Sequence, residues 1–526
     1  MLFRSDPEFM PYAEFPGAFC FDTTNPKSRE LIRQMLQDTL PLFETPVFSP
    51  MCDESFDFGQ GNSRKYVEKM GYGKALGEWY QFLIEEIKKA GKQVIFLAHD
   101  VIYKYPDALK AVQKENAIIY YWDYSNKKEY PAITKLKSYG LNVVGGPAIF
   151  DWSRHFPYYD FAEVNMIEMG KDGVERGMMA LITTRFGDFF SENLRENNYY
   201  GLAVNAQASW TPFLSDLNQI REAFAWNFYG TNDMRLINCM DILSKQNILL
   251  PRFPNGMFNR FWMDPFVREI KPQEYSMAKK FIEEAQEIFK ILHNLNEQKV
   301  ITINADNLDY LEFAAEMALH YGVKILISEA SYHKKGELAR FVEEKLKLPG
   351  GNSILEGFKW LKGHIAQLMS KYETLWLRLA VPQGLEHPMQ RFRILEWHYA
   401  QAIDDLLKNT NPHAHQLESE WIWISGKRTH PHWGNHRWYY FVQTFNAQSK
   451  IRKAQIQGIA MSNLKIAING QSVGEVFSRN AMSQKPMADG VQLFNVTDKI
   501  KEGENVICVD GINWAAGIGS INIALH

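Results

Sequence analysis

The chain has 526 residues, of which 46% are hydrophobic and 14% aromatic, and its formal net charge is -3. A chain of this length is expected to form roughly two to four globular domains. Because positive and negative residues are interspersed, the composition argues against a nucleic-acid-binding surface and against a polybasic membrane surface.

The cysteines and the hydropathy pattern exclude further classes of protein. The four cysteines have no paired spacing, which argues against a disulfide framework and a zinc knuckle, and we expect Cys52 to be an ordinary buried thiol. No run of about 18 apolar residues is present, so no transmembrane helix is predicted.

The first part of the chain alternates segments typical of strands and of helices. Strands are predicted at residues 46–48, 93–97, 117–121, 141–144 and 178–183. Helices are predicted at residues 27–43, 74–89, 107–114, 131–138 and 161–169, the first with Asn25-Pro26 as its cap and first turn. Each strand is apolar throughout, which is typical of a parallel sheet between helices. A closed barrel needs about eight such units, so the sheet is either open or lacks about three units at its front.

Polar and aromatic residues follow the predicted strands, where α/β barrels keep their catalytic groups. Asp53 and Glu54 follow the first strand, and Gly59 and Gly61 then mark a loop. Taken alone, the acidic pair is more simply a solvated loop start, because buried charges are costly. The later strands are followed by Asp100, by Trp122 and Tyr124, by Asp151 and Trp152, and by Asp188.

Residues 52–63 (Cys-Asp-Glu-Ser-Phe-Asp-Phe-Gly-Gln-Gly-Asn-Ser) resemble the acid motif of family 20 glycoside hydrolases, the β-N-acetylhexosaminidases. The resemblance covers roughly residues 8–230, and its further segments are residues 12–14, 25–26, 40–43, 150–152, 181–188 and 201–210. It implies a partial TIM barrel holding strands four to eight, so we expect strands one to three, with the family's sugar-binding arginine, to precede residue 1. The family more often has tryptophan at the position of Phe186.

The resemblance also implies substrate-assisted, retaining hydrolysis, in which the 2-acetamido oxygen of the substrate attacks the anomeric carbon. Glu54 would be the general acid, with a pKa raised by burial and by the charge of Asp53. Asp53 would stay ionised and accept the acetamido N–H, and Tyr124 would hold the acetamido carbonyl. The family uses no metal and no organic cofactor for this reaction, so none is expected here.

The remaining site residues would bind the sugar. By the same resemblance, Trp122, Trp152 and Trp210 would wall the pocket around the acetyl methyl group and the sugar face. For each tryptophan, core packing is an equally simple explanation. Asp100 and Asp188 would bind hydroxyls or merely cap the next helix.

A second region, residues 231–410, is predicted to be helical. Apolar residues at helical spacing indicate helices at residues 272–295, 308–346, 353–379 and 388–407. This region resembles the helical domain that follows the barrel in the same branch of the family. A packing and dimerisation module without chemistry is its simpler interpretation, so a homodimer is an open possibility.

Strand patterns return in residues 411–526, at 421–423, 438–445, 464–468, 491–496 and 505–509. Asn469-Gly470 predicts a hairpin turn. The region looks like the galactose-binding-like jelly rolls of many glycosidases. It is either a glycan-binding module that uses Trp433, Trp438 or Trp514, or a structural sandwich that supports the helices.

We therefore predict an α/β protein with three domains: a catalytic (β/α) barrel portion (1–230), an α-helical domain (231–410) and a β-sandwich (411–526). The predicted activity is that of an exo-β-N-acetylhexosaminidase, and the predicted partners are glycans that end in an N-acetylhexosamine. Two alternatives remain open. One is a non-catalytic glycan-binding protein with an incomplete or degenerate barrel, and the other is a glycosidase of different sugar specificity.

Overall fold

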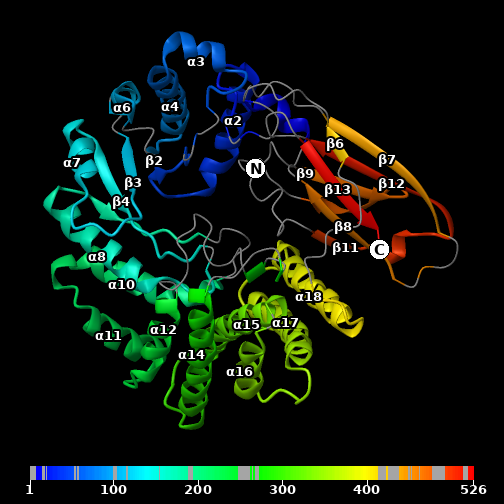
Figure 1. The fold of residues 1–526 in the computed structure, drawn as a ribbon. Helices are drawn as coiled ribbons and strands as arrows, with labels where there is room; N and C mark the ends of the chain where they lie inside the picture. Colours follow the sequence, from blue (N-terminus) through cyan, green and yellow to red (C-terminus); the bar gives the residue numbers. More distant parts are fainter. Residues whose placement is uncertain are drawn as a thin grey trace.

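The computed structural model describes most of the chain. The described residues are 7–14, 18, 20–52, 55, 58–98, 104–113, 117–152, 154–186, 193–246, 261–262, 265–266, 272–333, 335–412, 422–424, 438–447, 451, 453–460, 463–476, 492–512 and 519–525. They form a parallel α/β part, a helical part and a pair of antiparallel sheets, in chain order (Figure 1). None of the helices in these ranges is long and apolar enough to cross a membrane.

The α/β part contains a five-stranded parallel sheet in the sequential order β1-β2-β3-β4-β5. Its strands are β1 (Val47–Phe48), β2 (Gln93–Ala98), β3 (Ile118–Trp122), β4 (Asn142–Gly146) and β5 (Ala180–Leu181). All five predicted strands are present, although β5 is shorter than expected. Within the described ranges the sheet is open, with β1 and β5 at its edges, and no closed barrel is formed. The part-barrel interpretation therefore stays a prediction.

Helices precede β1 and connect the successive strands. They are α2 (Pro26–Thr39), α3 (Arg64–Met70), α4 (Tyr72–Lys89), α6 (Pro106–Gln113), α7 (Pro131–Ser138) and α8 (Tyr159–Glu175), with the short 3-10 helices η1 (Pro7–Tyr12) and η2 (Leu40–Leu42). The predicted start of α2 is confirmed, because the Asn25 side chain accepts a hydrogen bond from the Lys27 N–H (2.9 Å) and Pro26 is the first helical residue.

Both faces of the central strand β3 are buried. Ile119 and Tyr121 pack into the hydrophobic core formed with α4, α6 and α7. Ile118 and Tyr120 point to the opposite face, where they are buried together with Val144 of β4. This two-sided burial explains why the strands are apolar throughout, as predicted.

Helices dominate the middle of the chain. They are η3 (Arg195–Asn198), α10 (Tyr199–Trp210), η4 (Pro212–Leu214), α11 (Leu217–Tyr229), α12 (Arg235–Gln246), α14 (Pro272–Glu297), η6 (Ala305–Asn307), α15 (Leu308–Tyr332), α16 (Gly336–Leu346), α17 (Ser353–Leu377) and α18 (Glu386–Leu407). The single helix predicted at residues 308–346 is wrong, because the chain forms two helices, α15 and α16, over this range.

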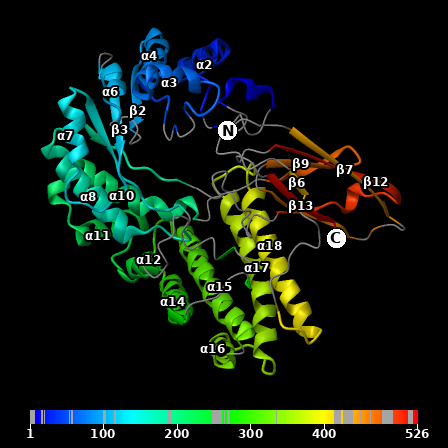
Figure 2. The same ribbon diagram turned by 45° about the horizontal axis from the view of Figure 1, so that its top comes forward.

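One continuous hydrophobic core runs through this region. It includes Ile149 beside β4, Tyr200 of α10, Leu236 of α12, Phe281 of α14 and Tyr399 of α18. Helices before and after residue 230 thus share a core, and the division of the chain at that residue stays a prediction. In Figures 1 and 2 the helices, coloured green to yellow, lie between the two sheet-containing parts.

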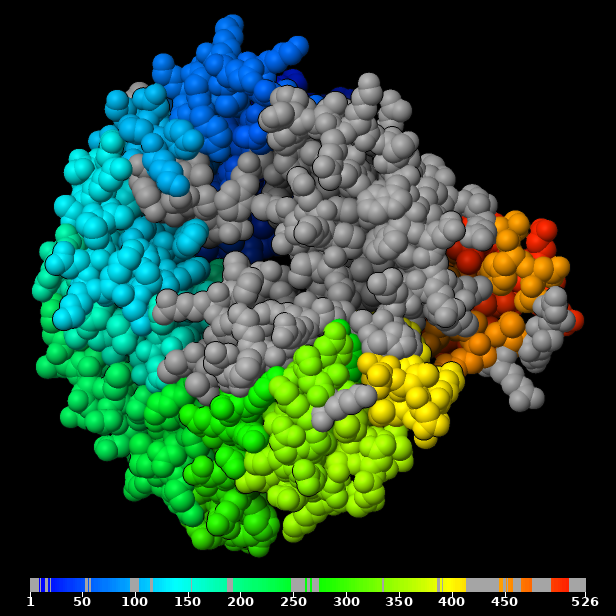
Figure 3. Space-filling model, viewed as in Figure 1, coloured from blue at the N-terminus to red at the C-terminus, as the bar shows by residue number. Residues whose placement is uncertain are grey.

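The last part forms two four-stranded antiparallel sheets, ordered β10-β9-β12-β7 and β11-β8-β13-β6. The strands are β6 (Ile422–Ile424), β7 (Trp438–Ala447), β8 (Gln455–Ala460), β9 (Asn463–Ile468), β10 (Gln471–Val476), β11 (Gln492–Asn495), β12 (Gly503–Ile512) and β13 (Gly519–Leu525), with the 3-10 helix η8 (Thr497–Lys499). The predicted Asn469-Gly470 hairpin is confirmed, because it joins β9 to β10 with both residues at positive φ. On the face shown in Figure 3, α18 (yellow) adjoins these sheets (orange to red).

Candidate active site

β1 leads into the loop that carries the predicted catalytic pair. Asp53 and Glu54 themselves lie outside the described residues, so their predicted roles stay predictions. The two residues before them, Met51 and Cys52, have φ values of 65° and 60°. Residues other than glycine rarely adopt this left-handed conformation, and such backbone strain is concentrated at functional sites. The Cys52 side chain is half-buried, which is less than expected.

Glu14 fixes the loop that follows the acidic pair. Its buried carboxylate accepts hydrogen bonds from the backbone N–H groups of Gly59 (3.1 Å), Gly61 (3.2 Å) and Ser63 (3.1 Å), and from the Ser63 hydroxyl. Gly59 has a φ of 75°, and a Cβ atom there would lie 3.0 Å from Val67, so the turn requires glycine. Burial raises the pKa of the Glu14 carboxyl, and the hydrogen bonds only partly offset this effect.

The residue that follows Glu54 is held by α4. The Tyr72 hydroxyl donates a hydrogen bond to the Ser55 carbonyl oxygen (3.3 Å). The Tyr72 ring also packs edge-on against Phe58 (5.2 Å between ring centroids) and stacks on Tyr105 (4.5 Å). The described part of the acid loop is therefore anchored both from Glu14, just after η1, and from α4.

Aromatic side chains gather at the carboxyl ends of β3, β4 and β5. Tyr124 stacks on Trp122, with 5.0 Å between ring centroids, and lies 5.4 Å from Trp152. Phe150 packs on Trp152 at 4.9 Å, and Phe186 lies 6.3 Å from Tyr124 and 6.4 Å from Trp152. These five residues are called the aromatic cluster below. All except Phe150 are half-buried, so their rings keep some exposed surface.

The structure thus brings together three predicted substrate-binding residues, Trp122, Tyr124 and Trp152. Trp210 does not join them, because it is the last residue of α10 on the helix layer and is 88% exposed. Its predicted role in the pocket wall therefore stays a prediction. Asp100 and Asp188 lie outside the described residues.

Asp151, beside the aromatic cluster, is buried and ties three segments together. Its carboxylate forms an ion pair with Arg185 Nε (2.8 Å) and accepts hydrogen bonds from the Phe186 N–H (3.1 Å) and from Asn198 Nδ2 (3.1 Å). Burial raises the pKa of Asp151, and the charge of Arg185 and the hydrogen bonds only partly offset it. The sequence identified Asp151 as a strand-end residue but gave no reason to pair it with Arg185. Two residues in different loops can form an ion pair without leaving a periodic pattern in the sequence.

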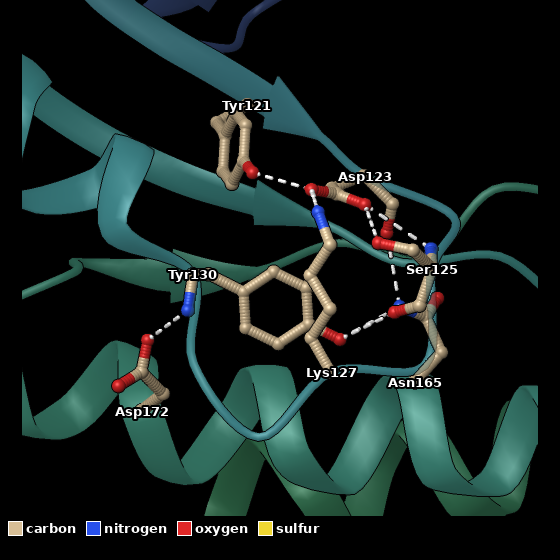
Figure 4. Close-up of polar contacts among 7 residues, drawn as sticks. All are labelled: Tyr121, Asp123, Ser125, Lys127, Tyr130, Asn165 and Asp172. Atoms are coloured by element: carbon tan, nitrogen blue, oxygen red, sulfur yellow. Dashed lines mark hydrogen bonds and ion pairs between the residues drawn. The ribbon is translucent and has the colours of Figure 1, made fainter.

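Asp123 shapes the turn that holds Tyr124 (Figure 4). It accepts hydrogen bonds from the Tyr121 hydroxyl (2.6 Å), the Ser125 N–H (3.1 Å) and hydroxyl, and Lys127 Nζ (3.0 Å). Burial opposes ionisation of Asp123, but these four hydrogen bonds and the Lys127 charge outweigh it and lower its pKa.

Asn165 of α8 links this turn to the segment after β4 (Figure 4). Its buried amide nitrogen donates hydrogen bonds to the carbonyl oxygens of Asp123 (2.9 Å) and Ser125 (3.1 Å) and to the Tyr130 hydroxyl (3.0 Å). Its amide oxygen accepts from the Ala148 N–H (3.1 Å). One side chain therefore holds two of the three segments that carry the aromatic cluster, those after β3 and β4.

The acid loop and the aromatic cluster lie at the same edge of the sheet. All five strands are parallel, so the segments after β1 and after β3–β5 emerge at the carboxyl edge. One strand, β2, separates β1 from β3, which places their ends about 10 Å apart at the usual strand spacing. No group of three or more metal-ligating side chains occurs among the residues described.

Comparisons with known proteins give only distant similarities. No protein-family model matches the chain, and no curated protein matches it significantly. Among solved structures, an α-L-rhamnosidase from Dictyoglumus thermophilum is similar over 22% of this chain and 15% of its own, with 13% identity and a TM-score of 0.15.

Two further structures are similar over more of the chain. A GH138 enzyme targeting pectin rhamnogalacturonan II is similar over 99% of this chain and 78% of its own, with 11% identity and a TM-score of 0.39. The Flavobacterium johnsoniae chitobiase, a GH20 protein, is similar over 72% of this chain and 60% of its own, with 12% identity and a TM-score of 0.32. The chain thus spans less than two thirds of the first and third of these structures. These neighbours are glycoside hydrolases at low identity, and TM-scores this low do not establish a shared fold.

Proposed function

We propose that the chain is an exo-β-N-acetylhexosaminidase that releases terminal N-acetylglucosamine or N-acetylgalactosamine by substrate-assisted, retaining hydrolysis. The proposal is supported by the order of the chain, in which the acid motif comes directly after β1, a strand whose carboxyl end lies at the same sheet edge as the aromatic cluster. Aromatic rings stack on the C–H faces of sugars, and a nearby carboxyl can protonate the leaving oxygen.

Each group has a role in this proposal. Glu54 protonates the glycosidic oxygen and later activates water, while Asp53 accepts the acetamido N–H and stabilises the positive charge that forms on the oxazolinium ring. Tyr124, whose hydroxyl oxygen accepts a hydrogen bond from the Thr184 hydroxyl (3.2 Å), holds the acetamido carbonyl. Trp122 and Trp152 wall the pocket.

The test is a leaving-group comparison of wild type and Glu54→Gln. The variant should lose roughly 10²–10⁴ in kcat on 4-nitrophenyl N-acetyl-β-glucosaminide, the usual range for a lost general acid. The loss should be smaller for substrates with better leaving groups, because these need little protonation.

Glu68→Gln is the matched control, since Glu68 lies on the neighbouring α3 with a side chain 61% exposed and paired only with Arg64 among the described residues. Glu68→Gln should hydrolyse substrates with good and with poor leaving groups at the wild-type rate. Equal losses in Glu54→Gln for good and poor leaving groups would remove Glu54 from the acid role. An inactive wild-type chain that still binds N-acetylglucosamine would favour the glycan-binding alternative.

A further inference from the structure

A cavity away from the sheet edge of the candidate active site lies between the helical part and the C-terminal sheets. Its volume is about 670 Å³, within the usual range of about 300–1,000 Å³ for ligand pockets. One wall is formed by α17 and α18 and the other by β8, β10 and β11. Figure 1 shows α18 beside β11.

The helical wall presents one face of α18. Arg393, Glu396, Trp397 and Ala400 line the cavity, and their spacing of three, four and seven residues places them on a single side of the helix. Trp397 is half-buried, so part of its indole is available as a flat apolar surface. From α17, Lys362 completes this wall with an exposed side chain.

The sheet wall combines the apolar side chains of Val473, Leu493 and Phe494 with polar side chains whose direction follows from strand alternation. Ala454 and Ile456 point into the core between the sheets, so Lys453 and Gln455 point to the outer face, toward the cavity. Asn495 of β11 pairs directly with Gln455 of β8, which puts both amides on the same face.

Charge distinguishes this cavity from a purely structural gap. Three cationic side chains, Lys362, Arg393 and Lys453, line it against one acidic side chain, Glu396. Among the described residues, neither Lys362, Lys453 nor Glu396 has an ion-pair partner. A cleft lined mainly by charges of one sign raises the local concentration of oppositely charged ligands.

We propose that this cavity binds a saccharide that carries an anionic group. Trp397 would stack on the sugar face, the two amides and Glu396 would bond its hydroxyls, and the cationic side chains would hold its carboxylate or sulfate. Glu396 would disfavour a ligand with clustered charges such as a polyphosphate, because it would repel them. This binding site is separate from the proposed active site and does not depend on the proposed activity.

Isothermal titration of the full chain tests the proposal with three trisaccharides: a hexuronate, its neutral hexose counterpart and a sulfated hexose. The hexuronate trisaccharide, the sulfated trisaccharide or both should bind. The neutral trisaccharide should have an affinity at least about tenfold lower. Comparing the two acidic ligands identifies the anionic group. Added salt should weaken acidic binding, because the cations at the cavity are partly exposed.

The variant Lys362→Glu/Lys453→Glu should weaken binding of the acidic ligand by about tenfold or more, with an unchanged melting temperature because both side chains are exposed. Lys359→Glu is the matched control on α17, since Lys359 is paired with Glu356 and does not line the cavity. Equally tight binding of the neutral sugar, no binding of either acidic sugar, or unchanged binding by the double variant would each overturn the proposal.

Discussion

At the scale of single residues, the candidate site is held by buried polar side chains that reach it from distant parts of the chain. Glu14 contacts Ser63 across 49 residues, and Asn165 contacts Asp123 across 42. Their hydrogen bonds replace water around groups that would otherwise be buried unsatisfied. We expect such residues to be as important to the site as the groups that touch substrate.

Glu14→Gln tests this expectation for the acid loop. A glutamine offers one acceptor oxygen where the carboxylate uses two, and its NH₂ group would face backbone N–H donors. We expect a loss of about 2–4 kcal/mol in the free energy of unfolding, measured by urea denaturation, together with a lower kcat on an N-acetyl-β-glucosaminide.

Glu30→Gln is the control for this change, because Glu30 lies on the surface of α2 with a side chain 70% exposed. It should unfold and hydrolyse substrate as wild type does. If Glu14→Gln were as stable as Glu30→Gln, the hydrogen bonds of Glu14 would not be what fixes the loop.

The lowered pKa of Asp123 predicts how the stability of the fold depends on pH. Its pKa is lower in the folded chain than its ordinary value of 3.8, so ionised Asp123 stabilises the fold. This contribution is complete above about pH 4, the pKa in the unfolded chain, and is lost as the pH falls from there through the folded pKa. Asp123→Asn should therefore melt below wild type at pH 7, and the difference in melting temperature should shrink toward pH 3.

Asp107→Asn serves as the comparison, since the Asp107 side chain is half-exposed on α6. Its melting temperature should follow that of wild type across the same pH range. A difference between Asp123→Asn and wild type that stayed constant from pH 7 to pH 3 would show that the charge of Asp123 contributes nothing.

At the residue scale, the sequence could indicate which side chains gather at the sheet edge, while their roles in binding stay predictions. Trp122, Tyr124 and Trp152 could be placed together because the carboxyl ends of parallel strands meet at one edge. Glu14 and Asn165 could not be predicted as site residues, since a hydrogen bond between distant segments leaves no periodic pattern in the sequence.

At the scale of elements, the parallel strands and most of their connecting helices were predicted, because apolar runs and helical periodicity depend on local sequence. The short helix α3 was not predicted. The break between α15 and α16 was missed. α15 is buried on almost every side, so its sequence lacks the polar stripe whose interruption would mark a helix end. The length of β5 was overestimated, because an apolar run does not show how many of its residues find a partner strand.

The close crossing of α14 and α15 gives a prediction at this scale. A Cβ atom on Gly322 would lie 2.6 Å from the Ala278 carbonyl oxygen, so the two backbones meet too closely for any side chain there. Gly322→Ala should cost about 1–3 kcal/mol in the free energy of unfolding, because the helices must move apart.

Gly363→Ala makes the same chemical change on α17, where an added Cβ would meet nothing within 4 Å. It should stabilise the chain by up to about 1 kcal/mol, because alanine favours the helix. Urea denaturation of both variants checks the pair, and a Gly322→Ala variant as stable as Gly363→Ala would contradict the described helix contact.

At the scale of the whole molecule, one chain combines a parallel α/β part, a long helical core and paired antiparallel sheets. The sequence predicted this order, but the cavity between α18 and the sheets depends on how separate parts pack and left no local pattern. In our account the sheet edge of the first part hydrolyses the glycan and the cavity binds an acidic saccharide, so the two proposals assign separate sites to separate parts of the chain.

The most direct test of the proposed activity is the ratio of kcat/KM for 4-nitrophenyl N-acetyl-β-glucosaminide to that for 4-nitrophenyl β-glucoside, measured on the full chain. The glucoside lacks the acetamido oxygen that acts as the nucleophile, so the ratio should exceed about 10². It should fall sharply in Asp53→Asn, because Asp53 orients the acetamido group. Equal cleavage of the two substrates, or no cleavage of either, would contradict the account.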